Sequence, residues 1–486
     1  MKIESALVGK TFADFLFRPQ LGQVETRRSI PLSTRLAGEL EIGIPIVAAN
    51  MDSVTEESMA RTMAVEGGIG IVHRGMSIAA QAEQISRVKR SHGFQVEAPL
   101  CLSAQSTIRE ARAFIRKHHI TGILIEESEG NGRLAGLLSN RDIPWIGGFE
   151  NESVSRYMTP RDRLTTAAPG IEVQEAERIM FENRIEKLPL VDQAGQIAGL
   201  ITKKDVIMYR QRPHYSKDSK GRLLVGGAIG ARGDFLERGS ALIASGVDVL
   251  VIDIAHGHSQ IMQAAVEACR KSFGPVPLIC GNAGTSEGAR FLQAIGADAV
   301  KVGIGPGRGC RTRLETAAGV PQLQAIREAW CELGESIPII ADGGIQDDKD
   351  IFLALMAGAS SVMLGSMLSG TDEAPGQIIE DPGTGQKKKI YRGMTSPQAV
   401  LEALYDTEDP EEIEAALATP AEGQESQVAY RGSVKNILDR MTGHLRSAVS
   451  YAGSGSLQEA RTRVVPHLSE YLIPLSEASR RESYDR

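Results

Sequence analysis

A single cysteine, Cys310, stands in the segment of this chain best suited to chemistry. Residues 301–322 read KVGIGPGRGCRTRLETAAGVPQ, in which an apolar, strand-like run gives way to glycine-rich backbone and then to the thiol. This pattern is typical of a nucleophile presented at the end of a strand. A thiol attacks as its thiolate, which cations favour, and Arg308, Arg311 and Arg313 flank it in sequence. The alternative is an inert buried cysteine, although Gly-Arg-Gly-Cys-Arg is a poor core sequence.

Length and composition limit the classes of protein that the chain can belong to. Its 486 residues are enough for a barrel of about 250 residues plus a second domain. The sequence has 54 Lys and Arg, 61 Asp and Glu and no basic stripe, so we expect no nucleic-acid partner. Five scattered cysteines without a CxxC pair argue against disulfides or zinc. The sequence shows no apolar run of the roughly 18 residues that a membrane helix needs, so we expect a soluble cytoplasmic protein with no membrane partner.

Short β-rich runs, each followed by a helical pattern, recur along the chain. Continuous apolar strands that alternate with helices predict a parallel sheet covered by helices, and eight such units predict an α/β fold of the closed (β/α)8 TIM-barrel type. A doubly wound open sheet is the alternative. The eight runs are residues 44–52, 67–73, 223–230, 247–255, 276–284, 297–305, 337–345 and 360–368.

The barrel prediction also places the active site. In this fold the catalytic residues lie at the C-terminal ends of the strands. Residues able to do chemistry stand at five of these ends: Asn50, Asp253, Asn282, Cys310 and Asp342.

An excess of about 120 residues separates the second predicted unit from the third, far more than an ordinary strand–helix connection. We therefore predict an inserted domain at residues 93–212, with residues 1–92 and 213–486 forming the barrel. The insertion contains an internal repeat, because residues 133–143 read RLAGLLSNRDI and residues 196–206 read QIAGLITKKDV.

The two copies of the repeat carry matching polar residues. Asp142 and Asp205 could accept hydrogen bonds from ribose hydroxyls, while the hydroxyls of Ser139 and Thr202 meet phosphate. Equally, each aspartate could only cap a following helix.

A long stretch after the eighth strand, residues 370–432, is rich in Gly, Pro, Glu and Gln. At this place in a barrel we expect an irregular, mobile flap over the mouth. The charged C-terminal segment, SEASRRESYDR at residues 476–486, is expected to be disordered.

At the level of whole motifs, the chain resembles the IMP dehydrogenase and GMP reductase family over nearly its full length. The inserted repeats resemble the paired CBS modules (tandem CBS or Bateman domain) of many members, which typically bind adenine or guanine nucleotides. The resemblance also implies a homotetramer that pairs into an octamer through these modules. The matching motifs are AANMDSVTE (48–56), GGIGIVHRGMSI (67–78), KDSKGRLLVG (217–226), AHGHS (255–259), GNAGTSEGARFL (281–292), KVGIGPG (301–307), IIADGGI (339–345), GSMLSGTDEAPG (365–376) and YRGM (391–394).

The resemblance assigns roles to residues of this sequence. It makes Cys310 the nucleophile that attacks C2 of a purine nucleoside monophosphate to give a covalent thioimidate-type adduct, assisted by Thr312 and Glu422. Asp253 and Asn282 would face the nicotinamide ribose of the cofactor. The carbonyls of Gly303, Gly305 and Cys310 would correspond to a potassium site. The substrate residues implied are Asn50 and Met51 in AANMD, Asp342 for the ribose hydroxyls, Gly344, Gly365, Ser366 and Tyr391 for the 5′-phosphate, and the backbone near Gly393 and Met394 for the purine edge.

Two reactions share such a site. A dehydrogenase passes hydride from IMP to NAD⁺ and hydrolyses the adduct to xanthosine monophosphate, using an Arg-Tyr pair on the flap to activate water. A reductase expels ammonia from GMP and then delivers hydride from NADPH to the adduct. Its helpers are a Thr two residues after the Cys and a flap Glu in a Glu-Gly sequence.

The flap sequence favours reduction. Residues 395–422 contain one Tyr, Tyr405, and no Arg, so the Arg-Tyr pair is missing. A Tyr-Arg pair starts at Tyr430, but its order is the reverse of the dehydrogenase's Arg-Tyr pair and it lies beyond the Glu-Gly position. Thr312 and Glu422 stand where a reductase needs them, although dehydrogenases often share them.

One departure from the family pattern affects the phosphate site. The family's Ser two residues before the Cys is Arg308 here. Because Arg is a strong bidentate partner of phosphate, we expect Arg308 to replace the lost hydroxyl. The alternatives are a solvated surface Arg, or a preference for a different purine nucleotide.

The sequence therefore predicts a purine-nucleotide oxidoreductase. GMP reductase with NADPH is the first candidate, and IMP dehydrogenase with NAD is the second. From another class, a catalytically silent nucleotide-sensing regulator remains open, but the joint presence of Cys310, Thr312, Asp253 and Asp342 argues against it.

Overall fold

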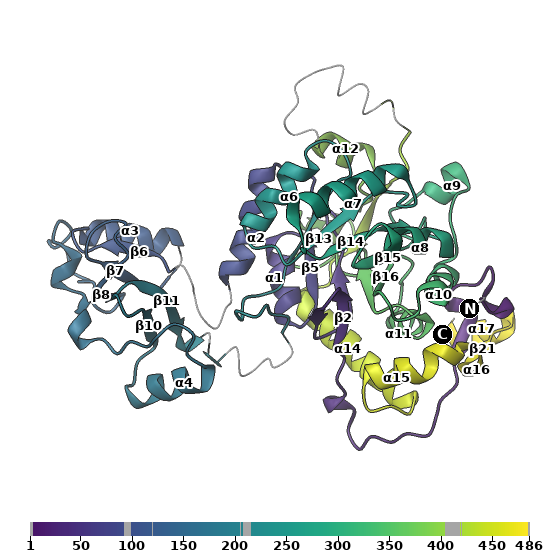
Figure 1. The fold of residues 1–486 in the computed structure, drawn as a ribbon, viewed down its shortest axis with the longest axis horizontal. Coiled ribbons are helices and arrows are strands. Elements are labelled where there is room, and N and C mark those ends of the chain that lie inside the picture. Colours follow the sequence, from purple (N-terminus) through teal and green to yellow (C-terminus); the bar gives the residue numbers. More distant parts are fainter. Residues whose placement is uncertain are drawn as a thin grey trace. The chain divides into compact units, whose positions relative to one another are not determined.

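Eight parallel strands close into a barrel in the order β12-β13-β14-β15-β16-β17-β4-β5 (Figure 1). Each strand lies within one of the eight predicted runs, so the predicted TIM barrel is confirmed and the open sheet is wrong. Nearly all strand residues are buried, because the barrel interior covers one face and helices cover the other. The strands are β4 (Ile46–Ala48), β5 (Ile69–Val72), β12 (Gly226–Ile229), β13 (Val249–Asp253), β14 (Leu278–Ala283), β15 (Ala299–Val302), β16 (Ile339–Asp342) and β17 (Ser361–Leu364).

The computed structural model describes residues 3–91, 99–118, 120–204, 206–207, 215–403, 418 and 420–484. By its internal contacts the chain divides into two units. The first comprises residues 1–89, 214–218 and 223–486 and contains the barrel. The second comprises residues 90–213 and 219–222.

Helices follow the barrel strands in sequence and cover the sheet from outside (Figure 1). Several begin at a hydroxyl that accepts from the first turn; the Ser259 side chain, for example, accepts from the amide of Met262. The barrel helices are α1 (Glu57–Val65), α2 (Ile78–Ser91), α6 (Phe235–Ala244), α7 (Gln260–Phe273), α8 (Ser286–Ala294), α9 (Thr312–Thr316), α10 (Gln322–Leu333), α11 (Asp348–Ala357) and α14 (Val434–Tyr451).

A hairpin of β2 (Thr34–Ala37) and β3 (Leu40–Ile42) lies at the N-terminal ends of the barrel strands. Its Leu36 and Ile42 belong to the same buried cluster as interior residues such as Val251. The Thr34 hydroxyl donates to the carbonyl of Ser360, just before β17, and the Gly38 amide to that of Asp298, just before β15. Because the hairpin covers this end, the C-terminal strand ends remain for chemistry.

The two ends of the chain pair with each other. β1 (Phe15–Phe17) runs antiparallel to β21 (Leu472–Pro474). The predicted disorder of the C-terminal segment is wrong, because α17 (Glu477–Tyr484) is a helix whose Tyr484 hydroxyl donates to the Phe15 carbonyl at 2.8 Å. The remaining helices here are α15 (Leu457–Val464) and α16 (Leu468–Tyr471).

The predicted flap contains regular structure. β18 (Ile379–Glu380), β19 (Lys387–Arg392) and β20 (Glu425–Ala429) form an antiparallel sheet, and α12 (Pro397–Ala403) follows β19. The expectation of an irregular segment is therefore wrong for these residues, because the lysine-rich strand β19 pairs along its length with β20. Tyr405 lies outside the described residues.

The second unit repeats a helix–strand–strand motif (Figure 1). Each copy of the sequence repeat forms a strand antiparallel to the one before it, and a small core joins the two copies through Leu134 and Leu200. Its elements are β6 (Cys101–Ser103), α3 (Ile108–His118), β7 (Gly122–Glu126), β8 (Leu134–Ser139), β9 (Thr159–Pro160), α4 (Val173–Glu182), β10 (Lys187–Val191) and β11 (Ile197–Thr202). In the described part of the chain, no helix is both long and apolar enough to cross a bilayer.

Candidate active site

The Cys310 loop leaves the barrel at the end of β15 through backbone that only glycine adopts easily. Gly303 has a φ of 152°, and a Cβ there would lie 2.0 Å from the carbonyl oxygen of Asp342. Gly305 has a φ of 80°. The loop can therefore turn tightly against the end of β16 and place Cys310, half-buried, at the mouth of the barrel.

A chain of two hydrogen bonds runs from the thiol to the flap. Cys310 Sγ donates to Thr312 Oγ1 at 3.1 Å, and Thr312 Oγ1 donates to Glu422 Oε2 at 2.7 Å. The chain joins a barrel loop to a residue 110 positions away in sequence. Its polarity is that of a proton path from sulfur to carboxylate.

Backbone hydrogen bonds hold the flap against the Cys310 loop. The Arg311 amide donates to the Glu422 carbonyl at 2.7 Å, and the Gln424 amide donates to the Gly309 carbonyl at 3.0 Å. Cys310 and Gly423 form an isolated antiparallel bridge. These bonds fix the Glu422 side chain opposite Thr312.

Gly393 and Met394 lie in the same junction. A Cβ on Gly393 would lie 2.4 Å from the Gly309 carbonyl oxygen, so the flap backbone passes directly over the Cys310 loop. Met394 Sδ accepts from the Asp52 amide at 3.4 Å. The structure thus brings the predicted purine-edge residues beside both the thiol and the β4 loop.

Tyr391 lies between the flap and the end of β17. Its hydroxyl lies 3.7 Å from Met51 Sδ, and a Cβ on Gly365 would approach that hydroxyl to 2.9 Å. Burial raises the pKa of Tyr391, and Asp342 adds to this, while Arg308 opposes it. The phenol therefore stays neutral and able to donate a hydrogen bond.

The other predicted phosphate residues stand at neighbouring strand ends. Ser366 is half-buried just after β17. Gly344, after β16, has a φ of 77°, and a Cβ there would lie 3.1 Å from Pro306 Cβ. The loops after β15 and β16 are therefore in contact beside the end of β17.

Sequence reasoning missed a buried lysine, Lys301, in the middle of the site. It projects from β15, is 2% exposed, and places Nζ 2.9 Å from Asp253 Oδ1, 2.6 Å from Asp342 Oδ2 and 2.5 Å from Asn282 Oδ1. A charged residue inside the apolar strand AVKV was the available signal, because a buried lysine needs partners.

The predicted cofactor and ribose residues form one network around this lysine. Asn50 Nδ2 donates to Asp253 Oδ2 at 2.7 Å, and Asn282 Nδ2 donates to Asp342 Oδ2 at 2.9 Å. Burial raises the pKa of Asp253, but the charge of Lys301 and the hydrogen bonds from Asn50 and Lys301 outweigh it, so the net shift is downward. Burial lowers the pKa of Lys301, but the charges of Asp253 and Asp342 raise it overall.

Of the three carbonyls predicted to bind potassium, that of Gly303 already has a partner within the chain. The Gly303 oxygen accepts from Asn282 Nδ2 at 2.6 Å, and the Ile304 oxygen accepts from Arg313 Nη2 at 3.2 Å. The Arg313 side chain lies directly against Gly305. The Gly303 oxygen is therefore already engaged, and potassium binding by Gly303, Gly305 and Cys310 stays a prediction.

In the second unit the predicted nucleotide residues of the first repeat bond to each other. Asp142 Oδ2 accepts from both the amide and the hydroxyl of Ser139 at 2.7 Å. The carboxylate thus closes a turn, and no helix starts at Asp142. Thr202 ends β11, and Asp205 lies outside the described residues.

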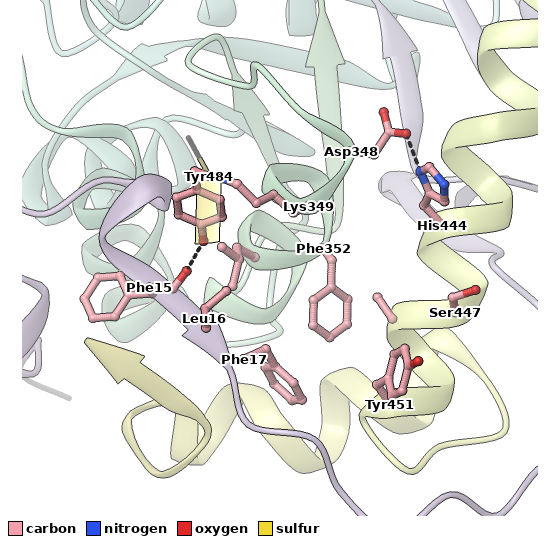
Figure 2. A pocket seen from close by; sticks show the side chains of 12 residues that line it. Phe15, Leu16, Phe17, Asp348, Lys349, Phe352, His444, Ser447, Tyr451 and Tyr484 are labelled. Carbon is pink, nitrogen blue, oxygen red and sulfur yellow. Dashed lines mark hydrogen bonds and ion pairs between the residues drawn. The ribbon is translucent and has the colours of Figure 1, made fainter. Parts of the chain in front are cut away.

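A separate apolar pocket of about 360 Å³ lies between β1, α11 and α14 (Figure 2). Phe17, Phe352 and Tyr451 line it, and at its edge His444 Nδ1 lies 2.6 Å from Asp348 Oδ2. None of the residues assigned above lines this pocket, so it is distinct from the Cys310 site.

Comparison with known proteins shows the family to which this chain belongs. The model of the IMP dehydrogenase / GMP reductase domain matches residues 9–485. The chain belongs to the IMP dehydrogenase and GMP reductase family. It is therefore an NAD(P)-dependent oxidoreductase of purine metabolism, which removes the silent regulator from the candidates.

Named relatives include both enzymes of the family. The chain is 43% identical over 454 residues to inosine-5′-monophosphate dehydrogenase of Nitrosopumilus maritimus, covering 93% of this chain and 94% of the relative. It is 42% identical over 458 residues to that of Aquifex aeolicus, with coverage of 94% and 92%.

A solved structure of the other enzyme resembles the whole chain. It is a cysteine-to-alanine variant of GMP reductase from Trypanosoma brucei in complex with guanosine 5′-monophosphate, with 37% identity and a TM-score of 0.89. The match covers 99% of this chain and 98% of that one. The comparisons therefore establish the family without separating the two reactions.

Proposed function

We propose that this protein is a GMP reductase that converts GMP and NADPH into IMP, ammonia and NADP⁺ through a covalent adduct on Cys310. The hydrogen-bond chain from Cys310 through Thr312 to Glu422 supports the covalent adduct, which both enzymes of the family would form. The observation that carries the choice of the reductase is the absence of any Arg in residues 395–422 of the sequence, because no Arg-Tyr pair is then present there to activate water.

The chain of hydrogen bonds gives the first half of the reaction its proton route. Thr312 takes the thiol proton of Cys310 as it passes its own hydroxyl proton to Glu422. The sulfur then bonds to C2 of GMP, and the exocyclic amine leaves as ammonia after the same proton returns through Thr312. Atoms balance, because the thiol hydrogen ends on the departing ammonia.

The second half needs a hydride at C2. The nicotinamide cofactor supplies this hydride when bound, and Cys310 leaves as a thiolate that takes up one proton from water to return to the thiol. Asp253 and Asn282, half-buried at adjacent strand ends, are suited to accept and donate at the nicotinamide ribose. Asp342 on the opposite side is suited to accept from the hydroxyls of the nucleotide ribose.

Phosphate binding is assigned to the junction of the loops after β15, β16 and β17. Tyr391, Ser366 and the backbone of Gly344 and Gly365 supply donors there. Arg308 adds an exposed guanidinium beside Gly309, where an added Cβ would lie 3.4 Å from Tyr391 Cε1. A bidentate Arg would replace the family's serine hydroxyl in this arrangement.

IMP dehydrogenase is the second candidate, since the relatives at 42% and 43% identity carry that name. The Tyr-Arg pair that starts at Tyr430 does not favour the dehydrogenase. The Tyr430 hydroxyl already donates a hydrogen bond to Asp372 Oδ1 at 2.6 Å. We assign adenine or guanine nucleotides to the second unit as regulatory ligands of a tandem CBS domain at residues 93–212. The tetramer or octamer stays a prediction.

One assay separates the two reactions. Purified protein is incubated with GMP and NADPH and, separately, with IMP and NAD⁺, while the nicotinamide absorbance is followed. Oxidation of NADPH alone supports the reductase. Formation of NADH alone would overturn it in favour of the dehydrogenase.

A further inference from the structure

One buried cation connects the two sides of the proposed site. Lys301 Nζ contacts Asp253 on β13, Asn282 on β14 and Asp342 on β16, each within 2.9 Å. These partners come from three different strands, and Lys301 itself is on β15 between them. With 2% exposure, the ammonium has exchanged its water shell for these three oxygens.

The partners of Lys301 belong to two different ligands in the proposed function. Asp253 and Asn282 face the cofactor, whereas Asp342 faces the nucleotide ribose. Asn282 strengthens the connection because its Nδ2 donates to Asp342 while its Oδ1 accepts from Lys301. The amide orientation follows from this, since Oδ1 must face the ammonium.

We infer that Lys301 is a positioning residue, which holds Asp253 and Asp342 ionised at a fixed separation and so sets the cofactor ribose against the nucleotide ribose. This inference rests on the proposed function. Hydride transfer requires close alignment of donor and acceptor, and a displacement of about 1 Å costs on the order of 10²-fold in rate.

Loss of the ammonium leaves two carboxylates in a half-buried site, and desolvation and mutual repulsion then favour protonation of one of them. The other groups facing them are the guanidinium of Arg74, which acts on Asp253, and the phenol of Tyr391, on which Asp342 acts. Arg74 is exposed and so replaces the buried charge incompletely. A carboxyl that gains a proton can no longer accept from two ribose hydroxyls.

The test compares Lys301→Met with Lys89→Met, since Lys89 is a second buried lysine that contacts two carboxylates, Asp218 and Asp248, each at 2.9 Å. We measure the Kd for GMP and kcat from about pH 8 to about pH 5.5, with thermal unfolding of both variants. Lys301→Met is expected to lower kcat by about 100-fold and to raise the Kd by about 10-fold, increasingly so at low pH. Lys89→Met lowers thermal stability but keeps the kcat and the pH profile of the wild type.

Variants of the same residue separate charge from packing. Lys301→Arg keeps the charge, so the Kd for GMP should stay within about threefold of wild type and remain independent of pH. If Lys301→Met does not fold, Lys301→Gln takes its place, because glutamine is neutral but can still donate a hydrogen bond. If neither neutral variant folds, a pH-dependent Kd in Lys301→Arg overturns the inference.

The remaining outcomes are also decisive. If the kcat and pH profile of Lys301→Met match those of Lys89→Met, the positioning role of Lys301 is overturned. The proposed function still holds in that case, provided that the wild-type protein turns over GMP with NADPH. A wild-type protein that binds neither GMP nor IMP overturns both proposals.

Discussion

Thr312 Oγ1 and Glu422 Oε2 lie 2.7 Å apart and join the Cys310 loop to the flap. Because the hydrogen bonds run from Cys310 to the carboxylate through this hydroxyl, removing either group interrupts this proposed proton path. Glu422→Gln and Thr312→Val should each lower kcat by about 10²–10⁴-fold, with a smaller change in the KM for nucleotide. Steady-state kinetics checks this.

Glu425→Gln is the matched control for Glu422→Gln, because Glu425 lies on the same flap but is exposed. It should keep the kcat of the wild type. Equal losses in both variants would show that flap folding, rather than proton transfer, is affected.

Cys310→Ala should abolish turnover while leaving GMP binding and the thermal midpoint close to wild type. The side chain is half-buried and its loop is held by backbone bonds that alanine preserves. Mass spectrometry of wild-type protein quenched with GMP should show an adduct that the variant lacks. Turnover above background in the variant would exclude the covalent mechanism.

Arg308→Ser should raise the KM for GMP by about 10-fold, because a charge-assisted contact to phosphate is worth on the order of 1.5–3 kcal/mol and a serine hydroxyl replaces part of it. Arg311→Ser is the control. Arg311 flanks the same cysteine, but its guanidinium lies 2.7 Å from Glu315. An unchanged KM in Arg308→Ser would remove Arg308 from the phosphate site.

Gly303→Ala should destabilise the protein by about 3 kcal/mol, since the added Cβ meets the Asp342 carbonyl at a φ that L-residues rarely adopt. Gly443→Ala should do the opposite. Gly443 is exposed within α14 with open space around it, so alanine should stabilise by about 0.5–1 kcal/mol. Urea unfolding measures both, and a stable Gly303→Ala protein would contradict the tight turn.

The free energy of unfolding should fall when the pH drops below about 4. The folded-state pKa of Asp253 lies below its ordinary value of 3.8, so its stabilisation is present above that value and is lost as the pH falls through the folded-state pKa. For Lys301 the folded-state pKa lies above 10.5, so its contribution is lost only in strong alkali. In urea titrations Asp253→Asn should show a shallower acid slope, and an unchanged slope would contradict this.

The barrel itself could be read from the sequence. Alternation of buried strands and helices is a local pattern, and each of the eight strands occurs inside its predicted run. The same pattern placed Asp253, Asn282, Cys310 and Asp342 at one end of the barrel, because parallel strands bring their C-terminal ends together. The reactive loop was visible because glycine and cysteine occur together there.

Pairings between distant segments required the tertiary structure. Nothing in the local sequence indicates that Tyr484 would donate to Phe15 and keep the charged C-terminus helical. The lysine-rich sequence of β19 does not by itself predict a strand, and β19 forms a strand because it pairs with β20. From the sequence, Lys301 could be recognised only as a strand residue. Its role in the site was not visible there, because its three partners lie on other strands.

The sequence alone thus determined the barrel, the place of Cys310 in a glycine-rich loop after a strand and the family motifs, all of which depend on neighbouring residues or on a repeating period. The tertiary structure decided that Glu422 faces Thr312 and that Lys301 joins Asp253 to Asp342. Both are contacts between strands or loops far apart in sequence, and their geometry depends on how the barrel closes rather than on any local preference.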